Sequence, residues 1–126
     1  MTDFSNAISV ASSGMKAQAT RLRHVSENIA NADTPGFVAR DVPAFASYYA
    51  PPDDLAHQRA TRAAHLNGLQ SGHSIPIIQS PGDGAPNGNQ VSLETELLKS
   101  VEAKRAHDRA LAIYKSALKI LRSTTR

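Results

Sequence analysis

The sequence has no cysteine and no tryptophan, and aromatic residues make up only 5% of its 126 residues. Without cysteine the chain has no disulfide framework and no thiol chemistry. No apolar run approaches the roughly 18–20 residues that are needed to cross a bilayer, so no direct membrane insertion is predicted. The N-terminus also lacks a basic region followed by an apolar core and a small-residue cleavage site, so no cleavable secretory signal is predicted.

Proline is missing from the two ends of the chain, and Gly14 is the one glycine there. All seven prolines lie between Pro35 and Pro86, and six of the seven glycines lie between Gly36 and Gly88. We therefore expect a mainly α fold, with an N-terminal helix over 1–33 and a C-terminal helix over 92–126 that pair as a coiled coil. Residues 34–91 are predicted to be irregular, partly extended and mobile. Within them we expect a short extended segment over 37–42, a short apolar strand over 75–78 with Pro76 favouring a sheet edge, and a loop over 80–89. The length allows one domain, and this layout does not suit an enzyme built around a central pocket.

The N-terminal helix carries an apolar stripe on alternating steps of four and three residues, which keeps one seam on one side of a helix. The stripe is broken once, at Gln18, and consists of Phe4, Ile8, Ala11, Met15, Leu22, Val25, Ile29 and Ala32. Gly14 follows Ser12 and Ser13, so these three residues form a notch of small side chains. The notch is open to two interpretations, a locally frayed helix or the close approach of another backbone.

Ser92 is the expected N-cap of the C-terminal helix, and Glu94 and Glu96 lie in its first turn, where they oppose the helix dipole favourably. The helix carries two adjacent apolar stripes. One consists of Leu111, Tyr114, Leu118 and Leu121, and the other of Ala103, Ala106, Ala110, Ile113, Ala117 and Ile120. Two neighbouring stripes form an apolar face that is wider than one partner helix can cover. A helix of this length spans about 45 Å, which is long for so small a domain, so another chain is expected to cover part of it.

Charge and reactive residues give little support for nucleic-acid binding or catalysis. The net charge is +3, and residues 92–126 hold eight basic and four acidic side chains, a net +4. Glu102 and Asp108 interrupt the bases and no aromatic platform stands beside them, so no nucleic-acid partner is predicted. The five histidines lack metal-ligand spacing, and no serine lies in a nucleophile elbow. No catalytic residue, metal site or cofactor is predicted, and the chain is not expected to be an enzyme.

One segment is specific, and it closes the first helix: S-E-N-I-A-N-A-D-T-P-G-F over residues 26–37. Asn28 and Asn31 lie three residues apart on the last helical turn, where their amides can bind exposed backbone groups or reach a partner. Pro35 and Gly36 stop the helix and fix its exit direction, and Phe37 can fold back onto the apolar stripe. On physical grounds alone, a helix end followed by a turn explains the same residues.

This segment resembles the signature of the bacterial flagellar rod and hook proteins, and residues 38–41 (V-A-R-D) continue it as in the proximal rod subfamily. A second segment over 87–96, N-G-N-Q-V-S-L-E-T-E, is similar to that subfamily's D-G-N-x-V-D-L-E-x-E, with Asn87 and Ser92 where aspartates are usual. Residues 8–15 and 18–23 look more like a sibling rod subfamily, which usually carries an insertion in place of the Asp-Thr-Pro-Gly turn. The resemblance covers about two thirds of the chain. Its C-terminal half decides for the proximal rod subfamily, and the sibling subfamily stays open as the alternative.

The resemblance implies a structural subunit of the proximal rod of the flagellar basal body. It also implies export by the flagellar type III apparatus without a cleaved signal, and polymerisation in the periplasm through the terminal helices into a torque-transmitting shaft. The implied partners are further copies of the chain (a homo-oligomer), other rod and axial proteins including the membrane-ring junction protein, and the export apparatus. The expected subunit-interface residues are Ile8, Met15, Leu22, Val25, Asn28, Ile29, Asn31, Pro35, Gly36, Phe37, Leu97, Leu111, Tyr114, Leu118 and Leu121.

Two other classes of protein fit the same helices. A cytoplasmic coiled-coil adaptor or export chaperone would explain both helices without secretion. A basic amphipathic helix lying on an anionic membrane is the weaker alternative.

Overall fold

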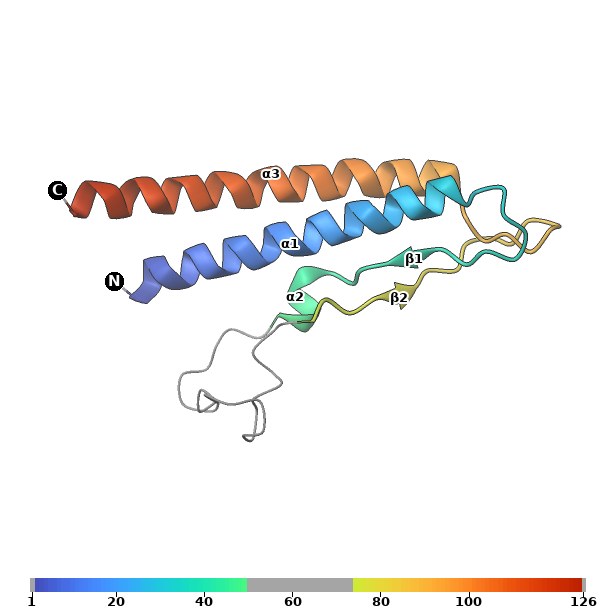
Figure 1. Ribbon diagram of the computed structural model, residues 1–126, viewed down its shortest axis with the longest axis horizontal. Coiled ribbons are helices and arrows are strands. Elements are labelled where there is room, and N and C mark those ends of the chain that lie inside the picture. Colours follow the sequence, from blue (N-terminus) through green and yellow to red (C-terminus); the bar gives the residue numbers. More distant parts are fainter. Residues whose placement is uncertain (1, 50–73, 126) are drawn as a thin grey trace, which may run out of the picture.

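The computed structural model describes residues 2–49 and 74–125. Two long helices, α1 (Thr2–Ala30) and α3 (Leu93–Thr124), lie side by side and antiparallel, with the two chain termini at the same end (Figure 1). The predicted mainly α fold with paired terminal helices is therefore confirmed. Much of the middle segment that was predicted to be mobile, residues 50–73, lies outside the described residues.

The boundaries of both helices follow from local chemistry. Ser92 precedes α3, and its hydroxyl oxygen accepts the backbone N–H of Thr95 at 3.5 Å, while Glu94 and Glu96 occupy the first turn. This is the N-cap expected from the sequence. At the other helix, α1 ends at Ala30 and the chain turns through residues 31–36. Gly36, which was predicted to help stop the helix, adopts a φ of 71°, a left-handed conformation that glycine reaches without steric cost.

Small residues form the seam between the two helices. Ala11 and Ala17 of α1 and Ala103 and Ala117 of α3 are buried. The helices come close at Gly14, where an added Cβ would lie 3.9 Å from the Cβ of Ala110. The notch of small residues in α1 is thus matched by an alanine of α3 in the same chain. Because small side chains fill the seam, many of the larger apolar side chains of both helices are left at its edges or outside it.

The middle segment runs alongside α1 as two short strands and one helical turn (Figure 1). Strand β1 (Arg40–Asp41) pairs antiparallel with β2 (Ile78–Gln79), and α2 (Phe45–Tyr48) follows β1. The extended segment expected over residues 37–42 contains β1, and the loop expected over 80–89 is present. The strand expected over 75–78 is displaced, because pairing begins at Ile78, two residues beyond Pro76, which has no N–H to donate.

Candidate assembly site at the closed end of the helix pair

The two sequence motifs, residues 26–37 and 87–96, meet at one end of the molecule. We call this end the closed end and define it as residues 28–41 and 78–96. The side-chain amide of Asn89 donates to the carbonyl of Asn31 at 2.9 Å and to that of Thr34 at 2.6 Å. Asn89 is almost completely buried, and its side-chain oxygen accepts the N–H of Val91 at 2.8 Å. The same two carbonyls also accept the backbone N–H groups of Thr34 and Phe37, so one asparagine of the second motif adds a further hydrogen bond to each of two carbonyls in the turn after α1.

Backbone hydrogen bonds join the same two segments. The N–H of Gly36 donates to the carbonyl of Asn87 at 3.2 Å, and the N–H of Gln90 donates to the carbonyl of Phe37 at 2.9 Å. Gly88 has a φ of 77°, and a Cβ added to it would lie 3.5 Å from the Cα of Gly36. Glycine is therefore required at both positions by conformation, and at this crossing the two backbones pass close to each other.

Asn28 is completely buried at the centre of the closed end. Its side-chain N–H groups donate to the carbonyl of Arg40 at 2.8 Å and to the carboxylate of Glu96 at 2.9 Å, and its oxygen accepts the N–H of Arg40 at 3.0 Å. One amide thus joins α1, β1 and α3. The sequence left two roles open for this asparagine, binding backbone groups or reaching a partner. In the structure it binds backbone groups, and these belong to Arg40 of its own chain.

Glu96 belongs to a network of four charged side chains. It is 1% exposed and accepts from the Lys99 ammonium at 3.0 Å, and Lys99 also lies 3.4 Å from a carboxylate oxygen of Asp41. Arg21 donates to the other oxygen of Asp41 at 3.0 Å. Two cations and two carboxylates leave the network neutral, which is the condition under which charges can be buried.

The pKa of Asp41 reflects this setting. Burial raises the pKa of its carboxyl group, but the hydrogen bond from Arg21, the backbone N–H of Val42 at 2.7 Å and the charges of Arg21 and Lys99 together lower it below its usual value. The carboxylate is therefore the favoured form, and it is held by the folded closed end.

A few buried polar atoms have no hydrogen-bond partner within the described part of the chain. They are the side-chain oxygen of Gln18, Nε2 of His24 and the hydroxyl of Tyr48. The other ring nitrogen of His24 lies 3.0 Å from the Glu27 carboxylate. Burial raises the pKa of Tyr48. Among the described residues no group of His, Cys, Asp and Glu could hold a metal ion, and no described helix is long and apolar enough to cross a membrane.

The residues expected at a subunit interface fall into three groups. Val25 and Asn28 are buried, Ile29, Pro35, Gly36 and Leu97 are exposed, and the remaining nine are half-buried: Ile8, Met15, Leu22, Asn31, Phe37, Leu111, Tyr114, Leu118 and Leu121. The structure brings Asn28, Asn31, Gly36 and Phe37 together at the closed end. It places Ile8, Met15, Leu111 and the residues that follow Leu111 along the helix pair, away from that end.

Sequence reasoning missed the polar partners of Asn28. Glu96 was interpreted only as a favourable charge in the first turn of α3, and Asp41, Lys99 and Arg21 were given no role. A signal was nevertheless present, because Glu96 lies seven residues before Ala103 and is therefore on the buried face of α3. An acid on that face needs buried partners, and Glu96 has two, Asn28 in the last turn of α1 and Lys99.

A pair of terminal helices tied at one end by a hydrogen-bonded turn, with extended apolar surface left outside, is the arrangement of a structural assembly protein. The family model for the flagella basal body rod protein matches residues 8–37. The chain is 30% identical over 106 residues to the flagellar basal body rod protein FlgB of Agrobacterium fabrum, covering 81% of this chain and 79% of that protein. The chain therefore belongs to the flagellar basal body rod proteins, in their FlgB type.

Family membership bears on two of the sequence interpretations. The similarity to FlgB extends over most of the chain and favours the proximal rod subfamily over its sibling, FlgC. The family consists of structural rod proteins and is not an enzyme family. We therefore assign this chain to the structural rod subunits of the basal body.

Proposed function

We propose that this chain is exported by the flagellar type III apparatus without a cleaved signal and polymerises in the periplasm as part of the proximal rod. In the assembled rod its terminal helices pack against neighbouring subunits and transmit torque. The observation that carries the proposal is the apolar surface left uncovered by the helix pair. Leu93, Leu97, Leu98 and Val101 of α3 are all at least 48% exposed, and Ile29 of α1 is 37% exposed.

Two properties of the helix pair fit this role. The seam between α1 and α3 is made of small residues, so one pair of helices cannot bury its own larger apolar side chains. Burying such side chains stabilises an assembly by about 25 cal/mol for each Å² removed from water. The proposed partners are therefore other copies of the chain and other axial proteins, including the membrane-ring junction protein.

The polar network gives the closed end a separate role in the proposal. It fixes the position of α3 relative to α1 through contacts that a folded subunit satisfies internally, so each subunit adds to the rod with the same helix arrangement. The interface residues proposed from the sequence then have two different roles. Asn28 and Gly36 shape the subunit, whereas Ile29 and Leu97 face outward and contact neighbours.

The proposal is tested by replacing single interface residues with aspartate. In a strain that lacks the gene, Ile29→Asp and Leu118→Asp are expected to abolish motility while the protein is still made, because a charge would have to be buried between subunits. Ala19→Asp, an exposed position outside the apolar stripe, is the matched control and should swim normally. Swimming halos together with immunoblots measure both properties, and wild-type motility of Ile29→Asp and Leu118→Asp would contradict the packing role.

A further inference from the structure

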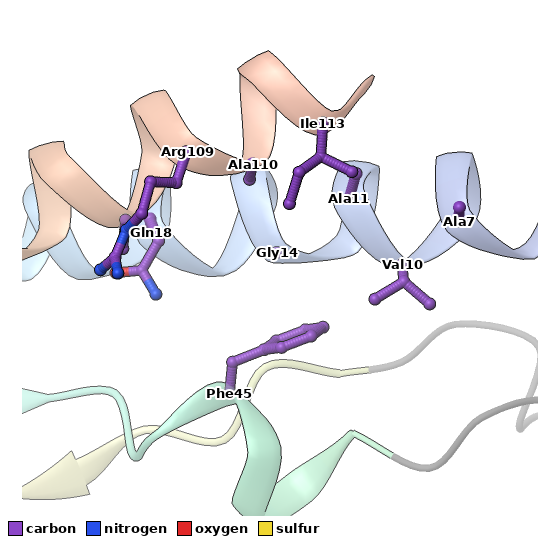
Figure 2. A pocket seen from close by; sticks show the side chains of 10 residues that line it. Ala7, Val10, Ala11, Gly14, Gln18, Phe45, Arg109, Ala110 and Ile113 are labelled. Carbon is purple, nitrogen blue, oxygen red and sulfur yellow. The ribbon is translucent and has the colours of Figure 1, made fainter. Parts of the chain in front are cut away.

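An open apolar groove lies between the two long helices and α2. Figure 2 shows Val10 and Gly14 of α1, Ala110 and Ile113 of α3, and Phe45 of α2 around it. Its volume is about 580 Å³. An apolar cavity of about 150 Å³ already holds a benzene molecule, so the groove has room for several aliphatic side chains.

Two polar side chains mark one end of this groove. The side-chain oxygen of Gln18 is buried and has no hydrogen-bond partner among the described residues. Arg109 lies beside it in the lining, and its guanidinium is drawn next to the Gln18 amide in Figure 2. An occupant that fits the groove is therefore apolar, with a carboxylate placed to meet Arg109 and a donor placed to meet Gln18.

The start of α3 carries a surface of matching chemistry. Leu93, Leu97 and Val101 follow one another at steps of four residues and are 48–59% exposed, and Leu98 beside them is 61% exposed. Four-residue steps place these side chains on one face of the helix. Glu96 and Ala103 are buried against α1, so this apolar ridge, Leu93 to Val101, lies on the opposite face of α3 and away from the groove. Glu94 lies within the ridge and is exposed.

We propose that the apolar ridge of one copy packs into the groove of a second copy. This inference rests on the proposed rod function and specifies which faces meet. If Leu97 of one copy lies level with Ala110 of its neighbour, the copies are displaced by 13 residues, or about 20 Å along the helix axis. A parallel arrangement then places Glu94 level with residue 107 of the neighbour, within one helical turn of Arg109.

The contact joins two different surfaces, so it is heterologous. Contacts of this kind generate a closed ring, or an open helical filament that has a free groove at one end and a free ridge at the other. Through a staggered heterologous contact, identical subunits can therefore add one after another to a helical rod, and no other protein is needed to connect them.

Disulfide cross-linking tests the contact directly, because the chain has no cysteine of its own. The variants Leu97→Cys and Ile113→Cys carry tags of different size and are co-expressed in motile cells that lack the wild-type gene. After mild oxidation and purification of basal bodies, we expect a mixed disulfide between the two variants. Each variant carries a single cysteine, and residues 97 and 113 of one subunit lie 16 positions apart on one helix, about 24 Å. The mixed disulfide can therefore form only between two subunits.

The controls separate this inference from the proposed function. Each cysteine variant expressed alone is expected to give no disulfide between like subunits, and Ala19→Cys paired with Ile113→Cys should give no mixed product.

The outcomes that contradict the inference are also distinct. The chain could be present in basal bodies while Leu97→Cys forms a disulfide only with a second Leu97→Cys subunit, only with an unlike protein, or not at all. The ridge-in-groove contact would then be wrong, and the rod function would stand. If the isolated Ile113→Cys protein fails to react with a thiol reagent, the chain itself fills the groove and the inference is also wrong. If the chain is absent from basal bodies, the proposed function itself fails.

Discussion

Asn28 is the side chain on which the closed end depends, because it makes three hydrogen bonds to two other elements while fully buried. Replacing it leaves the backbone groups of Arg40 and one oxygen of Glu96 unsatisfied. Each unsatisfied buried group costs about 1–3 kcal/mol, and more when it is charged. Asn31 lies just after the last residue of α1, and its side-chain amide donates to the carbonyl of Glu27 in an exposed setting.

We therefore expect Asn28→Ala to lower the free energy of unfolding by about 3 kcal/mol, measured by urea unfolding followed through the helical circular dichroism signal. Asn31→Ala is the matched control and should cost about 1 kcal/mol or less, since water replaces its exposed hydrogen bond. Equal losses in the two variants would show that the buried position of Asn28 has no special importance.

A second prediction at this scale concerns pH. The pKa of Asp41 is lower in the folded chain than its ordinary value of 3.8, so its contribution to stability is present above about pH 4. The contribution is lost as the pH falls through the folded pKa, because the unfolded chain binds the proton first. We expect the free energy of unfolding to fall more steeply below pH 4 in the wild type than in Asp41→Asn. The exposed Asp33→Asn should retain the wild-type slope, and an unchanged slope in Asp41→Asn would contradict the assignment.

At the scale of the elements, the sequence predicted both long helices, the capping role of Ser92 and the turn at Gly36. These features depend on local chemistry, such as proline and glycine placement and a side-chain oxygen before the first turn. The seam between the helices was harder to predict. The predicted stripes mixed alanines with larger apolar residues and did not say which of them meet. In the structure Ala11, Ala103 and Ala117 of these stripes are buried, together with Ala17, which lies outside them, whereas Ile29, Ile113 and Ile120 are exposed. Hydrophobic periodicity identifies an apolar face but does not say which residues on a wide face are the closest.

The polar network was missed for a related reason. Its members come from α1, β1 and α3, and no local sequence pattern predicts that Arg21, Asp41 and Lys99 lie in contact. The segment Ile75–Ile78 is a smaller error of the same kind. β-branched residues indicated a strand, whereas the partner strand determines where pairing starts.

Two glycines provide a test at the element scale. Gly14 lies inside α1, and an added Cβ meets only Ala110 at an ordinary contact distance. Gly14→Ala is therefore expected to stabilise the chain by up to about 1 kcal/mol through helix propensity. Gly36 has room for a Cβ but a φ of 71°, so Gly36→Ala should destabilise by about 1–2 kcal/mol. Thermal unfolding measures both, and destabilisation by Gly14→Ala would mean that the helices approach more closely than the structure shows.

At the scale of the whole molecule, one helix pair leaves apolar surface on more than one side. The groove beside Gly14 and the ridge from Leu93 to Val101 lie on different faces, so neither is covered by the internal pairing of α1 and α3. A chain of this kind is expected to remain a monomer until a growing end offers complementary surfaces, since isolated contacts between copies are small.

Sedimentation of the purified chain tests this expectation. We expect a monomer at micromolar concentration, with assembly only after nucleation. A cytoplasmic adaptor built from the same helices would instead give a stable dimer whose proportion changes little with dilution. A dimer that persists at nanomolar concentration would therefore support the adaptor and contradict the rod subunit.

The central claim is that the chain is built into the rod and that its N-terminal helix is needed for this. The most direct measurement purifies basal bodies from a deletion strain that carries either the full chain or a chain starting at Gly36. We predict that the full chain restores flagella and is found in the basal bodies, and that the shortened chain does neither. Flagella that persist without the gene, with the protein retained in the cytosol, would contradict the account.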